Sequence, residues 1–235
     1  MHLFYTENIN TTNNTISLPE EEAKHCSKVL RLVQGNKVEV IDGKGNLYKT
    51  EISLISTKQT ELKILETISE FGKRNFRLVI AAAPTKNIDR YEMFIEKAVE
   101  IGIDRIIPLN CRFSERKIIK SERLEKIIVS AMKQSYKAYK PEISELIDFE
   151  KFIKQDFAGQ KFIAHCYDTP KTKLKDLYKP NTDCLILIGP EGDFSEKEVE
   201  NAIKAGFEPI SLSDSRLRTE TAGIAACNTI NLLNY

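Results

Sequence analysis

The chain has 235 residues, of which 41% are hydrophobic, so it is long enough for one large domain or two smaller ones. Its 35 basic and 34 acidic residues leave a formal net charge of +1, so total charge identifies no class of partner. The five cysteines include no C-x-x-C pair, which argues against a disulfide framework or a zinc site, and we expect no bound metal. The sequence has no signal-peptide pattern and no apolar run of bilayer length, so we expect a soluble cytoplasmic protein without membrane association.

Residues 1–70 have the pattern of a small β-domain. Apolar and polar residues alternate on both sides of "DGKG" within residues 37–53, which predicts a β-hairpin, and residues 60–65 alternate in the same way. One helix is expected from about Pro19 to Leu32, because proline and acidic residues occupy its first turn. Polar residues and a glycine at 69–76 mark the expected boundary, so we divide the chain into domains 1–70, a small β-barrel, and 71–235.

The second domain has the pattern of an α/β fold. Continuous apolar runs predict strands buried on both faces, at residues 77–83, 105–109, 161–166, 184–189 and 209–212. Helical spacing lies between them, at 87–102 with Gly102 as the stop and at 195–206 with a capping box of Ser195 and Glu198. This alternation predicts a mostly parallel sheet.

The stretch "LILIGPEGDFSEKE" at 185–198 is the first candidate for chemistry. A buried strand ends at Gly189, and Pro190 and Gly192 turn the chain into a capped helix, at the end of a strand where α/β sheets bind ligands. The chain has no G-x-x-x-x-G-K-S/T motif, and its only G-x-G lies in the hairpin, which argues against a P-loop or Rossmann dinucleotide site. Six acids and one lysine around the loop favour a cationic or neutral ligand, although an ordinary strand-to-helix loop is the simpler alternative.

The stretch "LSDSRLRTETA" at 212–222 is the second candidate. It follows an apolar run and precedes an alanine-rich helical pattern, whose small residues allow another segment to pack very close. The alternative is a plain strand-to-helix loop in which Thr219 or Thr221 caps the helix.

Two basic segments are candidates for contact with nucleic acid. Residues 111–140 carry nine basic against three acidic residues, with tyrosines and polar residues among them, which suits a phosphate backbone. On the helix expected at 19–32, His25 and Lys28 lie three residues apart with Arg31 one turn further, a weak hint of RNA binding. A solvated charged helix face is the alternative for both. The RNA-binding candidates are His25, Arg31, Arg112, Arg116, Lys133 and Gln134.

Together these stretches resemble the ribosomal RNA small subunit methyltransferase E family of the SPOUT class, in order and over nearly the whole chain. "HCSKVLR" and "DGKG" match its N-terminal PUA-like domain, and "IEKAVEIGIDRIIPL" and "AMKQSYKAYKPEI" resemble its central segments. "IGPEGDFSEKE" and, about 25 residues later, "LRTETA" match its two C-terminal signatures. The pair of signatures is far more specific than "GPEG" alone.

The resemblance implies a fold and an activity. The C-terminal domain is expected to be an α/β SPOUT domain with a trefoil knot, which general topology rules would have rejected. The resemblance also implies a homodimer, S-adenosylmethionine (AdoMet) as methyl donor, and uridine N3 in 16S ribosomal RNA of the small subunit as acceptor. The family's target is uridine 1498, near the decoding site.

The resemblance also implies the site residues. Backbone and side chains of the two signatures are expected to bind the donor, at Leu187, Gly189, Glu191, Gly192, Leu212, Leu217, Thr219, Thr221 and Ala222. Arg218 is the candidate cation that favours the uridine anion, and Glu220 or Glu191 is the candidate proton acceptor or loop-orienting acid.

The chain departs from the family pattern within both signatures. Asp193 stands where members commonly have a second glycine, and Ser213, Ser215 and Arg216 stand where Gly, Arg and Ile are common. These changes bear on side-chain roles more than on donor binding. The alternatives are a SPOUT methyltransferase for a ribose 2′-O or guanine N1 site, and a noncatalytic RNA-binding protein that kept the fold.

Overall fold

The computed structural model spans the whole chain and describes residues 2–10 and 13–235. It forms two compact units: residues 1–73 with 132–140, and residues 74–131 with 141–235. The division after Lys73 lies in the polar segment 69–76. The short segment 132–140, which falls in the second domain by sequence, belongs to the first unit in the structure.

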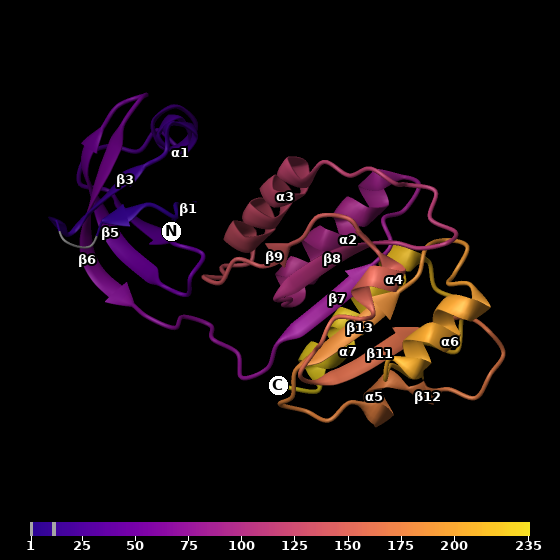
Figure 1. The fold of residues 1–235 in the computed structure, drawn as a ribbon. Helices are drawn as coiled ribbons and strands as arrows, with labels where there is room; N and C mark the ends of the chain where they lie inside the picture. The colour runs from indigo at the N-terminus through magenta and orange to yellow at the C-terminus, as the bar shows by residue number, and fades with distance from the viewer. Residues whose placement is uncertain (1, 11–12) are drawn as a thin grey trace. The chain divides into compact units, whose positions relative to one another are not determined.

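The first unit is built on a six-stranded sheet and confirms the β-domain (Figure 1). The strand order is β1-β4-β5-β6-β3-β2. The strands are β1 (Leu3–Tyr5), β2 (Ile9–Asn10), β3 (Thr15–Leu18), β4 (Lys37–Ile41), β5 (Leu47–Ile55) and β6 (Thr60–Ile68). β4 and β5 pair antiparallel around "DGKG", so the predicted hairpin is present, and alternate residues of these strands enclose a core around Phe4.

The helix of the first unit is shorter than expected. It consists of α1 (Glu20–Lys24) followed by one π-helical turn, η2 (His25–Val29). Arg31 has a φ of 52° and therefore lies beyond the helix in the left-handed conformation, so the expectation of a helix reaching Leu32 with Arg31 on its face is wrong. A left-handed residue interrupts the helical hydrogen-bond ladder and ends the element.

The segment 132–140 packs on the hairpin of the first unit. The Gly45 amide donates to the Ala138 carbonyl at 3.0 Å, and the Lys140 amide donates to the Gly43 carbonyl at 2.9 Å. The Tyr139 ring lies so close to Gly45 that a Cβ there would come within 2.3 Å of it. The two glycines of "DGKG" therefore serve this packing as well as the turn.

The second unit contains a parallel sheet in the order β10-β8-β7-β13-β11-β14-β12, with β9 paired to β8 (Figure 1). All five apolar runs form strands of this sheet, which confirms the predicted α/β class. The strands are β7 (Leu78–Ala82), β8 (Arg105–Asn110), β9 (Glu142–Ile143), β10 (Ile147–Asp148), β11 (Gln160–Ala164), β12 (Thr172–Lys173), β13 (Cys184–Ile188) and β14 (Glu208–Ser211). β7 and β13 are buried along their whole lengths, because helices cover both faces of the sheet.

Within the described part of the chain, six helices follow β7, and α2 and α6 begin and end close to the predicted bounds 87–102 and 195–206. They are α2 (Ile88–Ile101), α3 (Ser121–Gln134), α4 (Phe149–Phe152), α5 (Leu174–Leu177), α6 (Glu196–Lys204) and α7 (Thr219–Leu232). Gly102 ends α2 with a φ of 135°, and Ser195 and Glu198 form the predicted capping box of α6. The N-cap of α7 is Arg218 and makes no side-chain cap bond, so neither threonine caps this helix.

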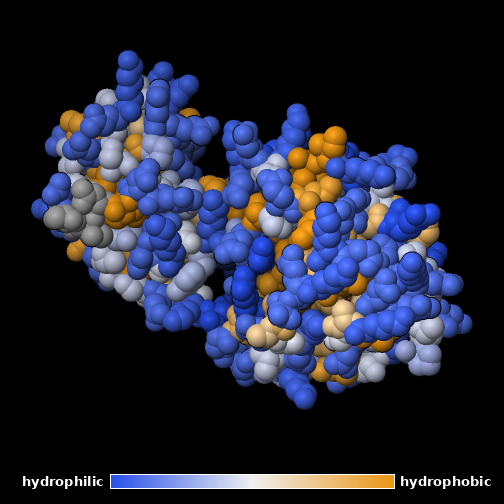
Figure 2. All heavy atoms as spheres, viewed as in Figure 1, coloured by the Kyte–Doolittle hydropathy of each residue, from blue (hydrophilic) through white to orange (hydrophobic). Residues whose placement is uncertain are grey.

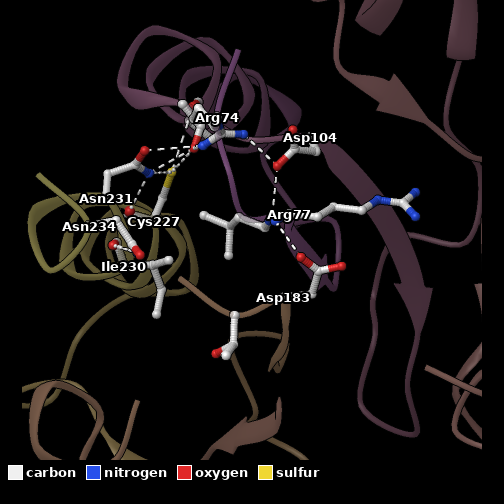
Figure 3. A network of polar contacts seen from close by, with 12 residues as sticks. Arg74, Arg77, Asp104, Asp183, Cys227, Ile230, Asn231 and Asn234 are labelled. Atoms are coloured by element: carbon white, nitrogen blue, oxygen red, sulfur yellow. Dashed lines mark hydrogen bonds and ion pairs between the residues drawn. The ribbon is translucent and has the colours of Figure 1, made fainter. Parts of the chain in front are cut away.

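A polar network holds α7 against the corner between α2 and β8 (Figure 3). Arg74 donates to the Gly102 carbonyl at 2.9 Å and to Asn231 Oδ1 at 3.1 Å, and its guanidinium pairs with Asp104. Asn231 Nδ2 donates to the same Gly102 carbonyl at 2.8 Å. The network fixes the C-terminal helix, whose first turn borders the site described below.

The surface in view is mostly hydrophilic in both units, and hydrophobic areas lie between the hydrophilic side chains (Figure 2). Across residues 2–10 and 13–235, no helix has the length and apolar character needed to cross a bilayer.

Candidate functional site

A cavity of the second unit lies where three neighbouring parallel strands end. β11 is the middle strand, and its last residue, Ala164, is in register with Ile188 of β13 and Ile210 of β14. The loops that follow these strands therefore begin at the same level of the sheet, the usual position of ligand sites in α/β folds. They enclose a cavity of about 860 Å³ together with the first turn of α7.

Both sequence signatures line this cavity. The β13 loop contributes residues 189–193, the β14 loop contributes residues 211–218, and α7 adds Thr219 and Ala222. The third wall comes from the β11 loop, at Ala164, His165, Cys166, Tyr167, Asp168, Thr169 and Lys171.

Side chains tie the loops to one another. Thr219 Oγ1, at the start of α7, donates to the Gly189 carbonyl at 3.0 Å in a buried position. Asp193 accepts from the Cys166 amide at 2.7 Å and from the Phe194 amide at 2.8 Å. Because hydrogen bonds to a charged acceptor are the stronger kind, the carboxylate joins the β13 loop firmly to the β11 loop.

The backbone conformation at Asp193 shows why an aspartate can stand where the family pattern has a glycine. Its φ is 65°, in the left-handed region that glycine enters without strain and that Asp enters more readily than most residues. The Asp side chain then gains two backbone partners that a glycine could not bind. Gly192 serves packing, because a Cβ there would lie 3.1 Å from Cβ of Phe113.

Charges around the cavity are nearly balanced. Acidic residues in the lining are Asp168, Glu191, Asp193 and Asp214, and basic residues are Lys171, Arg216 and Arg218. Glu191 accepts from the Lys86 amide at 2.8 Å, and Asp214 pairs with Lys173 at 3.0 Å. A polar organic molecule of small net charge suits such a lining better than a polyphosphate.

Most of the donor-binding candidates meet at this cavity. Those that line it, with the catalytic candidate Arg218, are Gly189, Glu191, Gly192, Leu212, Leu217, Thr219 and Ala222. Leu187 does not line it, because alternate residues of β13 face opposite sides and Leu187 packs in the core with α4 and α6.

Two candidates on α7 lie outside the lining. Thr221 is exposed, because it sits on the solvent side of the first turn. Glu220 is 5% exposed and lies 3.9 Å from the Arg90 guanidinium, so its carboxylate faces α2 rather than the cavity.

Sequence reasoning missed the β11 loop, and His165 above all. This residue is buried at the end of the middle strand and lines the cavity. Its sequence signal is its place near the end of the predicted strand 161–166, at the same edge of the sheet as the two recognised signatures.

The RNA-binding candidates are distributed over both units. In the first unit, His25, Arg31 and Gln134 are exposed, whereas Lys133 pairs with Glu22 and lies 5.9 Å from the centroid of the Phe4 ring. Lys133 therefore holds the segment 132–140 on the first unit.

In the second unit, Arg112 has an exposed side chain and lines a second cavity of about 570 Å³ with Lys117. Arg116 donates to the carbonyls of Thr85 at 3.0 Å and Lys86 at 2.6 Å, so its guanidinium orders the loop before α2. Within the described ranges of the chain, no three His, Cys, Asp or Glu side chains gather as a metal site would require.

Comparison with known proteins identifies the family of this chain. A family model described as an RNA methyltransferase domain matches residues 72–231, and one described as an RNA methyltransferase PUA domain matches residues 18–65. Ribosomal RNA small subunit methyltransferase E of Mesomycoplasma hyopneumoniae is 30% identical over 186 residues, which cover 76% of this chain and 80% of that protein.

Two solved structures of similar proteins match the fold along the whole chain. A Porphyromonas gingivalis crystal structure described as a "probable rRNA-methyltransferase" is 40% identical, with a TM-score of 0.92, and the match covers 100% of this chain and 98% of that one. Ribosomal RNA small subunit methyltransferase E of Neisseria gonorrhoeae, bound to S-adenosyl methionine, is 27% identical with a TM-score of 0.88, covering 100% and 98%. The resemblance drawn from the motifs is confirmed, and the chain belongs to the ribosomal RNA small subunit methyltransferase E family of RNA methyltransferases.

Proposed function

We propose that this protein methylates N3 of a uridine in 16S ribosomal RNA, at the family's position 1498, with AdoMet as the methyl donor. One observation carries the proposal: both C-terminal signatures line a single cavity and are joined there by the bond from Thr219 to the Gly189 carbonyl. Relatives support the donor, since the Neisseria gonorrhoeae protein was crystallised with it. A small-subunit substrate also places the protein in the cytoplasm.

The residues of the cavity fit AdoMet. The donor combines an apolar adenine face with polar ribose and amino-acid groups and one net positive charge, and the lining offers backbone, apolar and nearly balanced charged groups. The cavity also contains a buried imidazole whose ring nitrogens have no hydrogen-bond partner among the described residues, so both nitrogens could bind polar groups of the donor. Leu212, Leu217 and Ala222 would hold the apolar part, with Gly189 and Gly192 at the backbone.

The chain's own groups must orient the acceptor and manage its proton. AdoMet supplies a methyl group on a sulfonium, and the uridine imide nitrogen must lose its proton before it can accept that methyl. Arg218 is exposed at the rim of the cavity, where its guanidinium can stabilise the developing uridine anion. Of the two acidic candidates, Glu191 is exposed and lines the cavity, so we assign to Glu191, rather than to Glu220, the role of accepting the uridine proton. Holding both reactants in line should supply much of the acceleration.

The proposal includes the remaining expectations from the family: a trefoil knot in the C-terminal domain, a homodimer, and RNA contacts at the exposed residues His25, Arg31, Arg112 and Gln134. It also keeps residues 1–70 and 71–235 as the functional domains.

The direct test is methyl incorporation. Small subunits that lack the modification are incubated with the protein and AdoMet labelled on its methyl group, and the label is mapped by nucleoside mass spectrometry. We expect N3-methyluridine at one position. A label on a ribose 2′-oxygen or on guanine N1 would overturn the assignment, and binding of RNA without any incorporation would indicate a noncatalytic protein.

An Arg218→Ala variant should lose turnover far more than donor affinity, and equal loss of both would place Arg218 in the pocket wall.

A further inference from the structure

His165 is the buried titratable group that the recognised signatures leave without a role. It follows the middle strand β11, is 8% exposed, and lines the cavity between the β13 and β14 loops. Within the part of the chain that the structure describes, neither Nδ1 nor Nε2 has a hydrogen-bond partner. Buried polar side chains almost always have partners, so a buried ring with two open nitrogens in a cavity wall indicates a partner supplied from outside the chain.

The surroundings of His165 fix its charge state. Burial lowers its pKa, the positive charge of Lys171 lowers it further, and the carboxylate of Asp193 opposes both effects. The ring is therefore neutral near pH 7 and offers one N–H donor and one lone-pair acceptor. Its position is also set, because the Tyr167 ring lies 5.7 Å away between centroids and the Tyr167 hydroxyl is anchored on the Phe194 carbonyl at 2.8 Å.

We propose that His165 is a binding residue for the methyl donor, whose polar groups supply the hydrogen-bond partners that the imidazole lacks. This inference rests on the proposed function and assigns the His165 side chain to the donor site. A neutral ring satisfies the donor without repelling its sulfonium, whereas a lysine or arginine at this buried position would place like charges together. Water in the cavity is the competing partner, and the experiments below separate the two.

Histidine NMR gives the most direct test. The chain has three histidines, His2, His25 and His165, and the first two are exposed, so protein labelled with ¹⁵N-histidine carries two internal controls. We expect S-adenosylhomocysteine to shift the ring nitrogen signals of His165 and to leave those of His2 and His25 in place. Unchanged His165 signals at saturating S-adenosylhomocysteine would refute the proposal, because a bound ligand must change the hydrogen bonding of a ring that contacts it.

Calorimetry on variants measures the contribution to affinity. His165→Phe keeps a ring against Tyr167 and removes both nitrogens, and His165→Asn keeps a donor and an acceptor in a smaller side chain. Loss of two hydrogen bonds should weaken binding of AdoMet and of S-adenosylhomocysteine about tenfold to a hundredfold in the Phe variant. The Asn variant should recover part of the loss. His2→Phe, with the same change at an exposed position, should bind as the wild type does.

The outcomes distinguish this inference from the proposed function. Wild-type protein that binds neither AdoMet nor S-adenosylhomocysteine would overturn the proposed function itself. Wild-type protein that binds both, with equal affinity in the Phe variant, would overturn only the role of His165 and leave water as its partner. If the Phe variant fails to fold in thermal unfolding, the NMR titration of the wild type decides alone.

Discussion

The bond from Thr219 to the Gly189 carbonyl joins the start of α7 to the β13 loop at the cavity, and Thr219→Val tests its importance. Valine has nearly the same shape, so the change removes the hydroxyl and leaves the Gly189 carbonyl without the 3.0 Å bond. Gly189 is buried and Thr219 is 7% exposed, so water cannot readily replace the lost donor. An unsatisfied buried carbonyl costs about 1–3 kcal/mol of folding free energy.

The measurement is thermal unfolding with and without AdoMet. For a chain of this size, about 1 kcal/mol lowers Tm by about 2–4 °C, so a cost of about 1–3 kcal/mol should lower Tm by about 2–12 °C. AdoMet should raise the Tm of the variant less than that of the wild type, because the two loops that line the cavity are no longer joined at their base.

Thr221→Val is the matched control, on the same turn of the same helix. Thr221 is exposed and does not line the cavity, so its substitution should change stability by less than about 0.5 kcal/mol. Equal effects of the two substitutions, on Tm and on the shift caused by AdoMet, would refute the assignment of Thr219 as the link between the signatures.

Three further predictions test the packing, the loops and the charge state of the site. Gly223→Ala should destabilise the protein by about 1–3 kcal/mol in urea unfolding, because a Cβ there would lie 2.6 Å from the Phe94 ring; an unchanged urea midpoint would mean that the α2–α7 contact is looser. At position 193, the stability of the protein should fall in the order Asp, Gly, Ala. Glycine lacks the two charge-assisted hydrogen bonds but adopts a φ of 65° without strain, whereas alanine lacks the bonds and is also strained at this φ. An alanine variant as stable as the glycine variant would contradict this order. Because the folded-state pKa of His165 is lowered, the folded protein binds this proton less readily than the unfolded chain, so stability is lost as the pH falls below about 6.5 and levels off below the folded-state pKa. The stability of the wild type relative to His165→Asn should therefore decrease between about pH 7.5 and 5.5, and a constant difference would contradict burial of a neutral ring.

Local patterns predict the fold well where the interactions that stabilise each element are themselves local. The capping box of Ser195 and Glu198 and the stop at Gly102 form within one turn of chain, and both appear where the sequence places them. The apolar runs form strands because helices on both faces leave no polar positions along them. The same reasoning wrongly placed Arg31 within a helix, because the π-helical turn that precedes Arg31 has no sequence signature.

Long-range contacts set the features that local patterns missed. Residues 132–140 belong to the first unit because Tyr139 and the neighbouring backbone meet the glycines of the hairpin almost a hundred residues earlier, and a basic helical pattern carries no sign of this. Thr219 is a good capping residue by type, yet its hydroxyl bonds the Gly189 carbonyl thirty residues away in sequence instead of an amide of its own helix. Tertiary packing therefore decides whether the Thr219 hydroxyl bonds the distant carbonyl or an amide of its own helix.

The same reasoning separates what the family pattern fixes in this site from what this chain adds. The two signatures that carry the resemblance to the family approach each other here through Thr219 and Gly189. The link to the third loop comes instead from Asp193, at a position where the common glycine has no side chain to offer. Asp193 holds the β11 loop by the Cys166 amide, the residue directly after His165, so the departure from the family pattern fixes the backbone that presents the imidazole to the cavity. If His165 binds the donor, Asp193→Gly should weaken donor binding as well as stability, although the glycine restores the family's own residue.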